Sequence, residues 1–129
     1  MMRAALAALL MACAAMQAAD PAHLVFYCPG QRNQDRGRHE SIKIDGDKAV
    51  HKLSINHVWR TNVTPGNHFI YGDSRKYGRN YPLESGKTYY FRVEYLVTSG
   101  FLSSDTVRAV PVPAEVAMGE MTGFDEDQP

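Results

Sequence analysis

The chain has 129 residues, and its 14 lysines and arginines balance 14 acidic residues, so its formal net charge is zero. This balance argues against nucleic acid as a partner, because proteins that bind nucleic acids carry a clear excess of basic residues. Once a leader is removed, roughly 100 residues remain, which fits one domain with a core large enough to fold without disulfides.

Residues 1–19 have the pattern of a secretory signal peptide. Arg3 precedes an apolar run over 4–16, and two alanines stand just before residue 20. The run is too short to span a bilayer, which argues against a retained transmembrane helix. We therefore predict an exported protein of the cell envelope whose mature chain begins near residue 20.

The leader sequence is consistent with two routes of processing. Residues 10–13 resemble a bacterial lipobox, in which Cys13 would be acylated and would anchor the protein to the outer membrane. The alternative is ordinary cleavage near Ala18 or Ala19, which releases a periplasmic protein with no other membrane attachment. In both cases Cys28 is the remaining thiol of the mature chain, so we predict no intramolecular disulfide and a small buried side chain there.

Short runs in which apolar and polar residues alternate, separated by turn residues at roughly 8–12-residue spacing, predict strands rather than helices. We expect strands within 23–28, 41–45, 49–55, 58–63, 68–71, 86–97 and 106–112, and a short edge segment over 81–83. The pattern is typical of a small all-β protein, an antiparallel β-sandwich of about seven or eight strands.

Two turn signals predict hairpins. Asp45-Gly46 lies between two alternating runs, which is the strongest short hairpin signal a sequence carries. Pro65-Gly66 suits the two central positions of a type II turn, since the second position requires a positive φ. We expect this second turn to set the register between the strands over 58–63 and 68–71.

Residues 86–97 form the densest run of aromatic and β-branched residues, so we predict that they are the central strand. A period of two places Arg92 and Glu94 on one face, toward solvent or a polar rim. We expect the opposite face to lie in the core; its residues are Tyr89, Phe91, Val93, Tyr95 and Val97.

The end of the chain changes character. Residues 114–121 have the composition of two helical turns, although Gly119 weakens the helix. Acidic residues gather after them, and we expect 118–129 to be a disordered acidic tail. The predicted organisation is therefore a signal peptide over 1–19, a β-sandwich domain over 20–117 and a tail over 118–129.

Four segments carry a resemblance to a known family. They are residues 25–29, 42–46, 63–68 and 85–93, which read VFYCP, IKIDG, VTPGNH and SGKTYYFRV. From residue 23 to about 117 the chain resembles the exported bacterial family catalogued as domain of unknown function 2846. The family pattern has arginine where Cys28 stands here. The resemblance implies a sandwich of the immunoglobulin or transthyretin kind, similar to PEGA and carboxypeptidase regulatory-like domains. Many members are lipoproteins, and no activity is established for them.

The residues needed for catalysis or metal binding do not form a recognisable pattern. The five histidines make no His-x-x-x-His pair, and no Cys-x-x-Cys, Gly-x-Ser-x-Gly or Ser-x-x-Lys motif or glycine-rich phosphate loop occurs. We therefore assign no catalytic residue, metal or cofactor. The alternative is a small periplasmic hydrolase that combines His51 or His68 with a serine distant in sequence.

Two loops concentrate basic residues. They contain Arg32, Arg36 and Arg38 in the first loop and Arg75, Lys76, Tyr77 and Arg79 in the second. Arginine with tyrosine is enriched at binding hot spots, and arginine pairs with carboxylates and phosphates. We predict a non-catalytic envelope module whose two loops meet as a basic patch and bind an envelope protein or another anionic envelope component. The alternative is that both loops are ordinary solvated surface.

Overall fold

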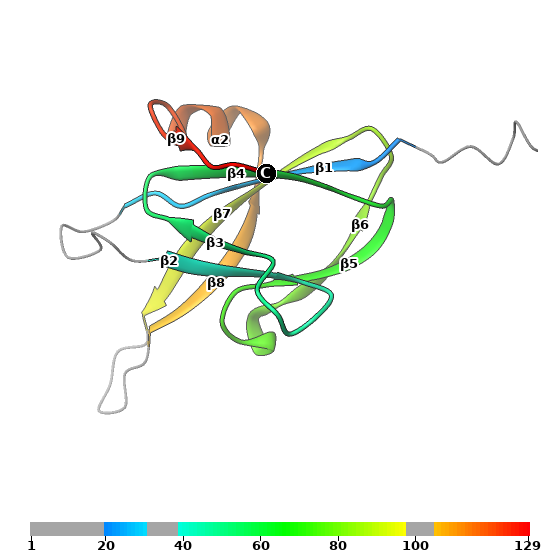
Figure 1. Ribbon diagram of the computed structural model, residues 1–129, viewed down its shortest axis with the longest axis horizontal. Coiled ribbons are helices and arrows are strands. Elements are labelled where there is room, and N and C mark those ends of the chain that lie inside the picture. Colours follow the sequence, from blue (N-terminus) through cyan, green and yellow to red (C-terminus); the bar gives the residue numbers. More distant parts are fainter. Residues whose placement is uncertain (1–19, 31–38, 98–104) are drawn as a thin grey trace, which may run out of the picture.

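The computed structural model describes residues 20–30, 39–97 and 105–129. In these ranges the chain forms strands β1 (Ala22–Tyr27), β2 (His39–Ile44), β3 (His51–Ser54), β4 (His57–Val63), β5 (Gly66–Tyr71), β6 (Arg79–Leu83), β7 (Thr88–Val97), β8 (Asp105–Val112) and β9 (Asp125–Glu126). One turn of 3-10 helix, η2 (Arg75–Tyr77), and one α-helix, α2 (Ala114–Glu120), complete the described elements (Figure 1). The prediction of an all-β sandwich is confirmed.

The strands form two sheets, with the orders β8-β7-β1-β4-β9 and β3-β2-β5-β6. Residues from both sheets meet in one hydrophobic cluster. It contains Ala22, Leu24, Phe26, Cys28, Ile42, Leu53, Trp59, Ile70, Leu83, Phe91, Val93, Val107 and Ala109. As expected from the sequence, Cys28 is buried there, and Phe91 and Val93 point inward while Arg92 and Glu94 lie on the other face. Tyr95 and Val97 belong to β7, but their side chains lie outside the described residues.

The pairing differs from a purely antiparallel sandwich in two places. β1 pairs with β7 in parallel, and β4 pairs with β9 in parallel. Parallel neighbours need a long crossover, and both pairs join segments far apart in the sequence. The prediction that residues 86–97 are the central strand is also wrong, because β1 lies in the middle of the five-stranded sheet and β7 beside it.

The hairpin predicted at Asp45-Gly46 is confirmed, since β2 and β3 are antiparallel neighbours. Its connection is longer than a tight turn, because the last pair toward the loop is Ile42 with His51. The end of β2 leaves β3 and pairs with β5 through Lys43 and Ile44. Asp45, at φ 65°, then accepts the Phe69 N–H at 2.8 Å. The loop of this hairpin therefore also forms the junction between β2 and β5.

Pro65-Gly66 does not close a hairpin, because β4 and β5 belong to different sheets. The positive φ predicted for Gly66 is confirmed at 124°. The two residues form a bend that carries the chain from one sheet to the other, and the register of β5 is set by its pairing with β6, where Gly66 stands opposite Leu83.

We expect Gly66→Val to destabilise the fold by about 1–3 kcal/mol, because a β-branched residue is strained at this φ. A side chain at Gly66 would meet no atom within 4 Å, so the cost comes from the backbone alone. Thermal unfolding measures it, and Pro65→Ala is the matched control, since it alters the same bend without a positive φ. Equal melting of Gly66→Val and the parent would contradict the assigned conformation.

Helix α2 covers the outer face of the five-stranded sheet (Figure 1). Its buried Ala117 packs with Val25 and Tyr27 of β1 in a second, smaller cluster. The Tyr27 hydroxyl donates to Glu120 at 2.7 Å, and burial together with this carboxylate raises the pKa of the Tyr27 phenol. Burial of an apolar face, rather than helix propensity, holds this short helix in place.

The expected disordered tail is instead a docked segment. β9 adds to the edge of β4, where His57 stands opposite Asp125, and Asp127 lies between two histidines. The Asp127 carboxylate contacts His51 Nε2 at 2.7 Å and His57 Nδ1 at 2.5 Å. The ordered domain therefore continues past residue 117, because acidic residues that would repel one another in isolation find partners on β3 and β4.

Candidate ligand-binding site

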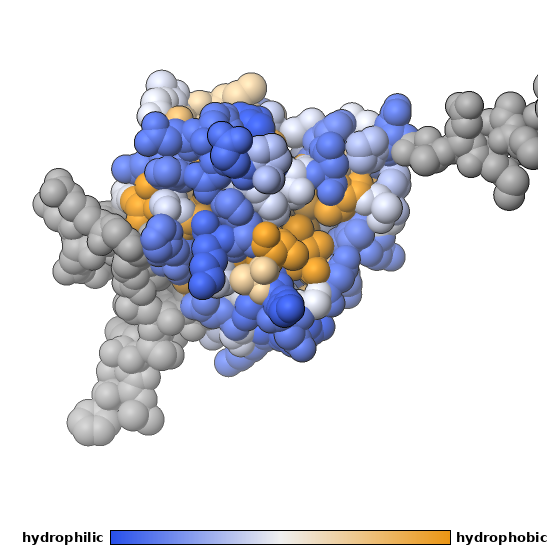
Figure 2. Space-filling model, in the orientation of Figure 1, coloured by the Kyte–Doolittle hydropathy of each residue, from blue (hydrophilic) through white to orange (hydrophobic). Residues whose placement is uncertain are grey.

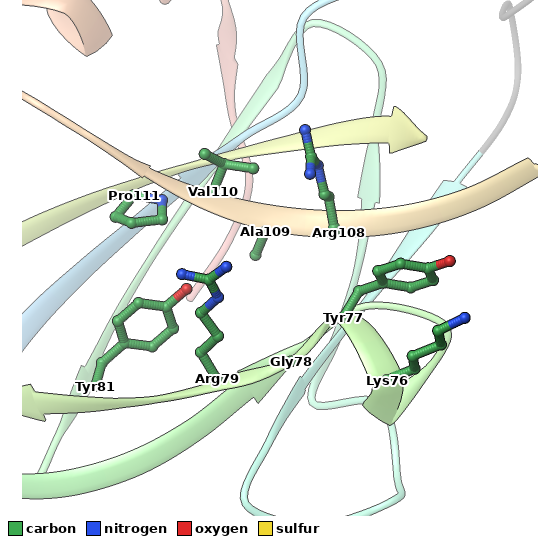
Figure 3. A pocket seen from close by; sticks show the side chains of 9 residues that line it. All are labelled: Lys76, Tyr77, Gly78, Arg79, Tyr81, Arg108, Ala109, Val110 and Pro111. Carbon is green, nitrogen blue, oxygen red and sulfur yellow. The ribbon is translucent and has the colours of Figure 1, made fainter. Parts of the chain in front are cut away.

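A pocket of about 330 Å³ opens where the two sheets separate at one side of the sandwich. One wall comes from η2 and β6 and the other from β8, the edge strands of the two sheets on this side (Figure 3). Its lining residues are Lys76, Tyr77, Gly78, Arg79, Tyr81, Arg108, Ala109, Val110 and Pro111. Figure 2 shows a face of the molecule that is largely hydrophilic, with hydrophobic residues in small groups near its centre and toward both sides.

The local sequence explains how this wall forms. The chain from η2 to β6 passes close to Phe69 and Tyr71, and a Cβ at Gly78 would lie 2.6 Å from the ring of Phe69 and 2.8 Å from the Cβ of Tyr71. Only glycine permits this close approach. β6 begins directly after it, and the alternation of a strand then places Arg79 on the same face as Tyr81, which packs against the core.

Arg79 is the cation at the centre of the pocket. Its guanidinium lies under β8 between Tyr81 and Ala109 (Figure 3). In the described part of the chain no carboxylate pairs with it, and it is exposed to solvent. Burial raises the pKa of the Tyr81 phenol, and the charge of Arg79 opposes that rise. The phenol therefore stays neutral and can donate or accept a hydrogen bond beside the guanidinium.

Lys76 and Arg108 contribute at the margin. The Lys76 ammonium lies 5.4 Å from the centre of the Tyr77 ring. Arg108 lines the pocket with its stem, while its guanidinium points away (Figure 3) and donates to Glu94 at 2.7 Å. The arrangement offers one free guanidinium, a lysine and two phenols against an apolar wall, and these groups together suit a carboxylate or phosphate with an apolar neighbour.

The structure describes one of the two basic loops of the predicted patch, the loop over 75–79. Lys76, Tyr77 and Arg79 line the pocket. Arg75 does not, because it donates to Asp47 at 2.8 Å and lies over Phe69, 4.8 Å from the ring centre. Arg75 therefore lies outside this pocket, and its place in a patch formed by both loops stays a prediction. Arg32, Arg36 and Arg38 lie outside the described residues, as does Cys13.

The β8 wall was missed by sequence reasoning. Arg108, Ala109 and Pro111 occur in a run that simply predicts a strand, and no motif connects them with residues 76–81. Their role depends on β6 and β8 being edge strands on the same side, which follows from sheet order and not from local pattern. The sequence signal that could have suggested an exposed edge is Pro111, since proline within a strand is confined to edges and bulges.

The two histidines of the hydrolase hypothesis are bound to acceptors. His68 Nδ1 lies 2.6 Å from Asp45 Oδ2, and its Nε2 lies 2.7 Å from the Thr64 carbonyl. Burial opposes the charge, but these two acceptors raise the pKa of His68 overall. Both ring nitrogens donate when the ring is charged, so His68 ties the bend after β4 to the end of β2.

His51 is held between the Asp127 carboxylate and the Trp59 ring, which it stacks upon with ring centres 4.4 Å apart. Among the described residues, a serine contacts a histidine where Ser54 Oγ lies 2.8 Å from His39 Nδ1. These residues stand opposite each other on β2 and β3, and no described carboxylate contacts the histidine. This pair is a cross-strand hydrogen bond on an exposed edge and lacks the third group of a triad.

Within the described ranges, no group of three or more histidine, cysteine, aspartate or glutamate side chains could hold a metal ion. A helix long and apolar enough to cross a membrane is likewise absent from residues 20–30, 39–97 and 105–129. No family model, curated protein or solved structure matches the chain. The resemblance to domain of unknown function 2846 therefore stays a prediction.

Proposed function

We propose that this protein is a non-catalytic binding module of the bacterial cell envelope that recognises an anionic group in the pocket between β6 and β8. The observation that carries the proposal is Arg79, a guanidinium inside a pocket with no described carboxylate paired to it. Other arginines of the described domain have such a partner: Arg60 pairs with Glu126, and Arg75 with Asp47. An arginine left unpaired among tyrosines is available to an external anion.

The compartment is inferred from the leader pattern over 1–19 and from the resemblance to an exported family. Both the lipid-anchored and the freely periplasmic forms agree with the pocket, because it lies on the folded domain. Arg79 is exposed to solvent, and the Tyr81 ring and the β8 wall lie beside its guanidinium. A planar guanidinium with a phenol and an apolar wall next to it can distinguish anions by shape as well as by charge.

The proposal predicts that Arg79→Ala lowers the affinity for envelope material by about tenfold, the equivalent of ~1.4 kcal/mol for one charge-assisted pair. Arg79→Lys should be intermediate, because an ammonium lacks the planar fork of a guanidinium. Capture from solubilised envelope fractions at low and high salt measures both. Lys52→Ala is the matched control, because it removes an equal charge from an exposed position on β3.

Binding by the parent should weaken at high salt, since exposed charges are screened over about 8 Å at physiological ionic strength. Lys52→Ala should follow the parent at every salt concentration. Capture that is independent of salt and unchanged in Arg79→Ala would show that the pocket is not the site.

A further inference from the structure

The backbone of β8 has a free edge that faces the pocket. The Val107 carbonyl accepts the Asp73 N–H at 3.3 Å, so the polar groups of Val107 point away from β7. In an antiparallel strand every second residue points its N–H and C=O to the same side. The polar groups of Ala109 and Pro111 must therefore point to the same outer edge as those of Val107.

Pro111 supports this assignment independently. It stands opposite Phe91 of β7, and a proline has no N–H to give to a ladder. Proline fits at a position whose backbone N–H would point away from β7, because the pairing with β7 does not need that N–H. The Ala109 N–H, the Ala109 carbonyl and the Pro111 carbonyl are thus left at the edge, and in the described part of the chain they have no hydrogen-bond partner.

We propose that the occupant of the pocket is an extended acidic peptide that adds to β8 as a short antiparallel strand and places a carboxylate on Arg79. This inference rests on the proposed function and names its ligand class. A peptide residue opposite Ala109 would accept the Ala109 N–H and donate to the Ala109 carbonyl, as in any hydrogen-bonded antiparallel pair. The peptide residue two positions earlier would stand opposite Pro111, and its N–H would donate to the Pro111 carbonyl.

The geometry selects the residue type. Side chains directly opposite each other on paired strands lie on the same face. Ala109 is 8% exposed and its side chain faces inward, into the mouth between the sheets where Arg79 lies. The peptide side chain opposite Ala109 therefore points at Arg79, and a glutamate or aspartate there completes the ion pair.

The edge also limits the length of the peptide. At one end the Val107 carbonyl already accepts the Asp73 N–H, and a Cβ at Gly72 would lie 2.6 Å from that carbonyl. The residues that follow β5 therefore occupy the edge of β8 at Val107. At the other end Pro111 offers an acceptor and no donor. The open stretch spans three residues, about 10 Å of strand, which favours a short linear segment over a whole added sheet.

Three probe peptides test the inference by calorimetric titration of the whole protein. They are acetyl-Thr-Val-Glu-Val-Thr-amide, the same peptide with glutamine in place of glutamate, and the glutamate peptide methylated on the glutamate backbone nitrogen. We expect the first to bind at least about tenfold more tightly than either of the others, because one lacks the charge and the other lacks the N–H. Arg79→Ala should abolish the difference between the glutamate and glutamine peptides.

The outcomes separate this inference from the proposed function. Equal binding of the N-methylated and parent peptides, with both weakened in Arg79→Ala, would overturn strand addition and leave anion binding intact. No preference for glutamate, together with no effect of Arg79→Ala, would overturn both. Dimerisation through this edge that the glutamate peptide cannot displace, measured by sedimentation, would assign the edge to a second copy and overturn the peptide proposal.

Discussion

Phe91→Ala should destabilise the protein by about 3–5 kcal/mol, a large part of the stability of a small domain. Phe91 is 1% exposed and stacks on Phe26 with ring centres 5.2 Å apart. It also meets Tyr81 edge to face at 5.1 Å, so its removal opens a cavity beside the pocket wall. Chemical denaturation with urea measures the change in the free energy of unfolding.

Arg92→Ala, one position along the same strand, is the matched comparison. Arg92 lies under helix α2, where it donates to Glu120 at 2.9 Å and to Glu94 at 3.1 Å. The three side chains are partly exposed, so we expect a smaller loss of about 1–2 kcal/mol. A larger loss for Arg92→Ala than for Phe91→Ala would mean that the two faces of β7 are assigned the wrong way round.

Asp127→Ala should release the C-terminal segment from the sandwich and destabilise the fold by about 1–3 kcal/mol, because it leaves two histidines without their shared acceptor. Hydrogen exchange should accelerate at the amides of Asp125 and residue 127, which donate to the Asn56 and Val58 carbonyls. Glu126→Ala is the control. Its carboxylate pairs with Arg60 at an exposed site, where an ion pair contributes about 0–1 kcal/mol.

The contact of Asp127 with the two histidines also predicts that the stability of the C-terminal segment depends on pH. Burial disfavours the charged Asp127 carboxylate, but the hydrogen bonds from His51 and His57 outweigh it and hold the pKa below its usual range. A carboxyl whose pKa is lower in the folded state stabilises the fold above its unfolded pKa of about 4, and this contribution is lost as the pH falls through the folded value. The protection factor of the amides in this segment, which is the intrinsic exchange rate at each pH divided by the observed rate, should therefore fall in acid in the parent and should be low at every pH in Asp127→Ala. A high protection factor in Asp127→Ala at neutral pH would contradict the proposed anchoring role.

Alternation of side chains was enough to predict most strands and the two faces of β7. Phe91 and Val93 are buried, and Arg92 is not, as a period of two requires. Local signals located the turns but did not specify the partner strand in every case. After Asp45-Gly46 the chain returns to the same sheet as β3, whereas after Pro65-Gly66 it passes to the other sheet as β5. The turn residues alone do not distinguish these two outcomes.

The tail and the pocket show why long-range features escaped prediction. The acidic composition of residues 125–127 predicts disorder, and only the tertiary approach of His51 and His57 supplies the partners that order them. Arg79 was recognised as a binding candidate from its loop, but the opposite wall at Ala109 is thirty positions away. No local pattern brings these two segments together, because their contact follows from the order of strands in two sheets.

The most direct test of the pocket is an NMR titration of the labelled protein with N-acetylglutamate at constant ionic strength, observing backbone amides and arginine Nε–H groups. We expect shifts to gather at Arg79 Nε–H and at the amides of residues 76–81 and Ala109, and to disappear in Arg79→Ala. Shifts that leave Arg79 unchanged, or that are spread over distant cations such as Lys52 and Lys87, would contradict the assignment of an anion-binding site between β6 and β8.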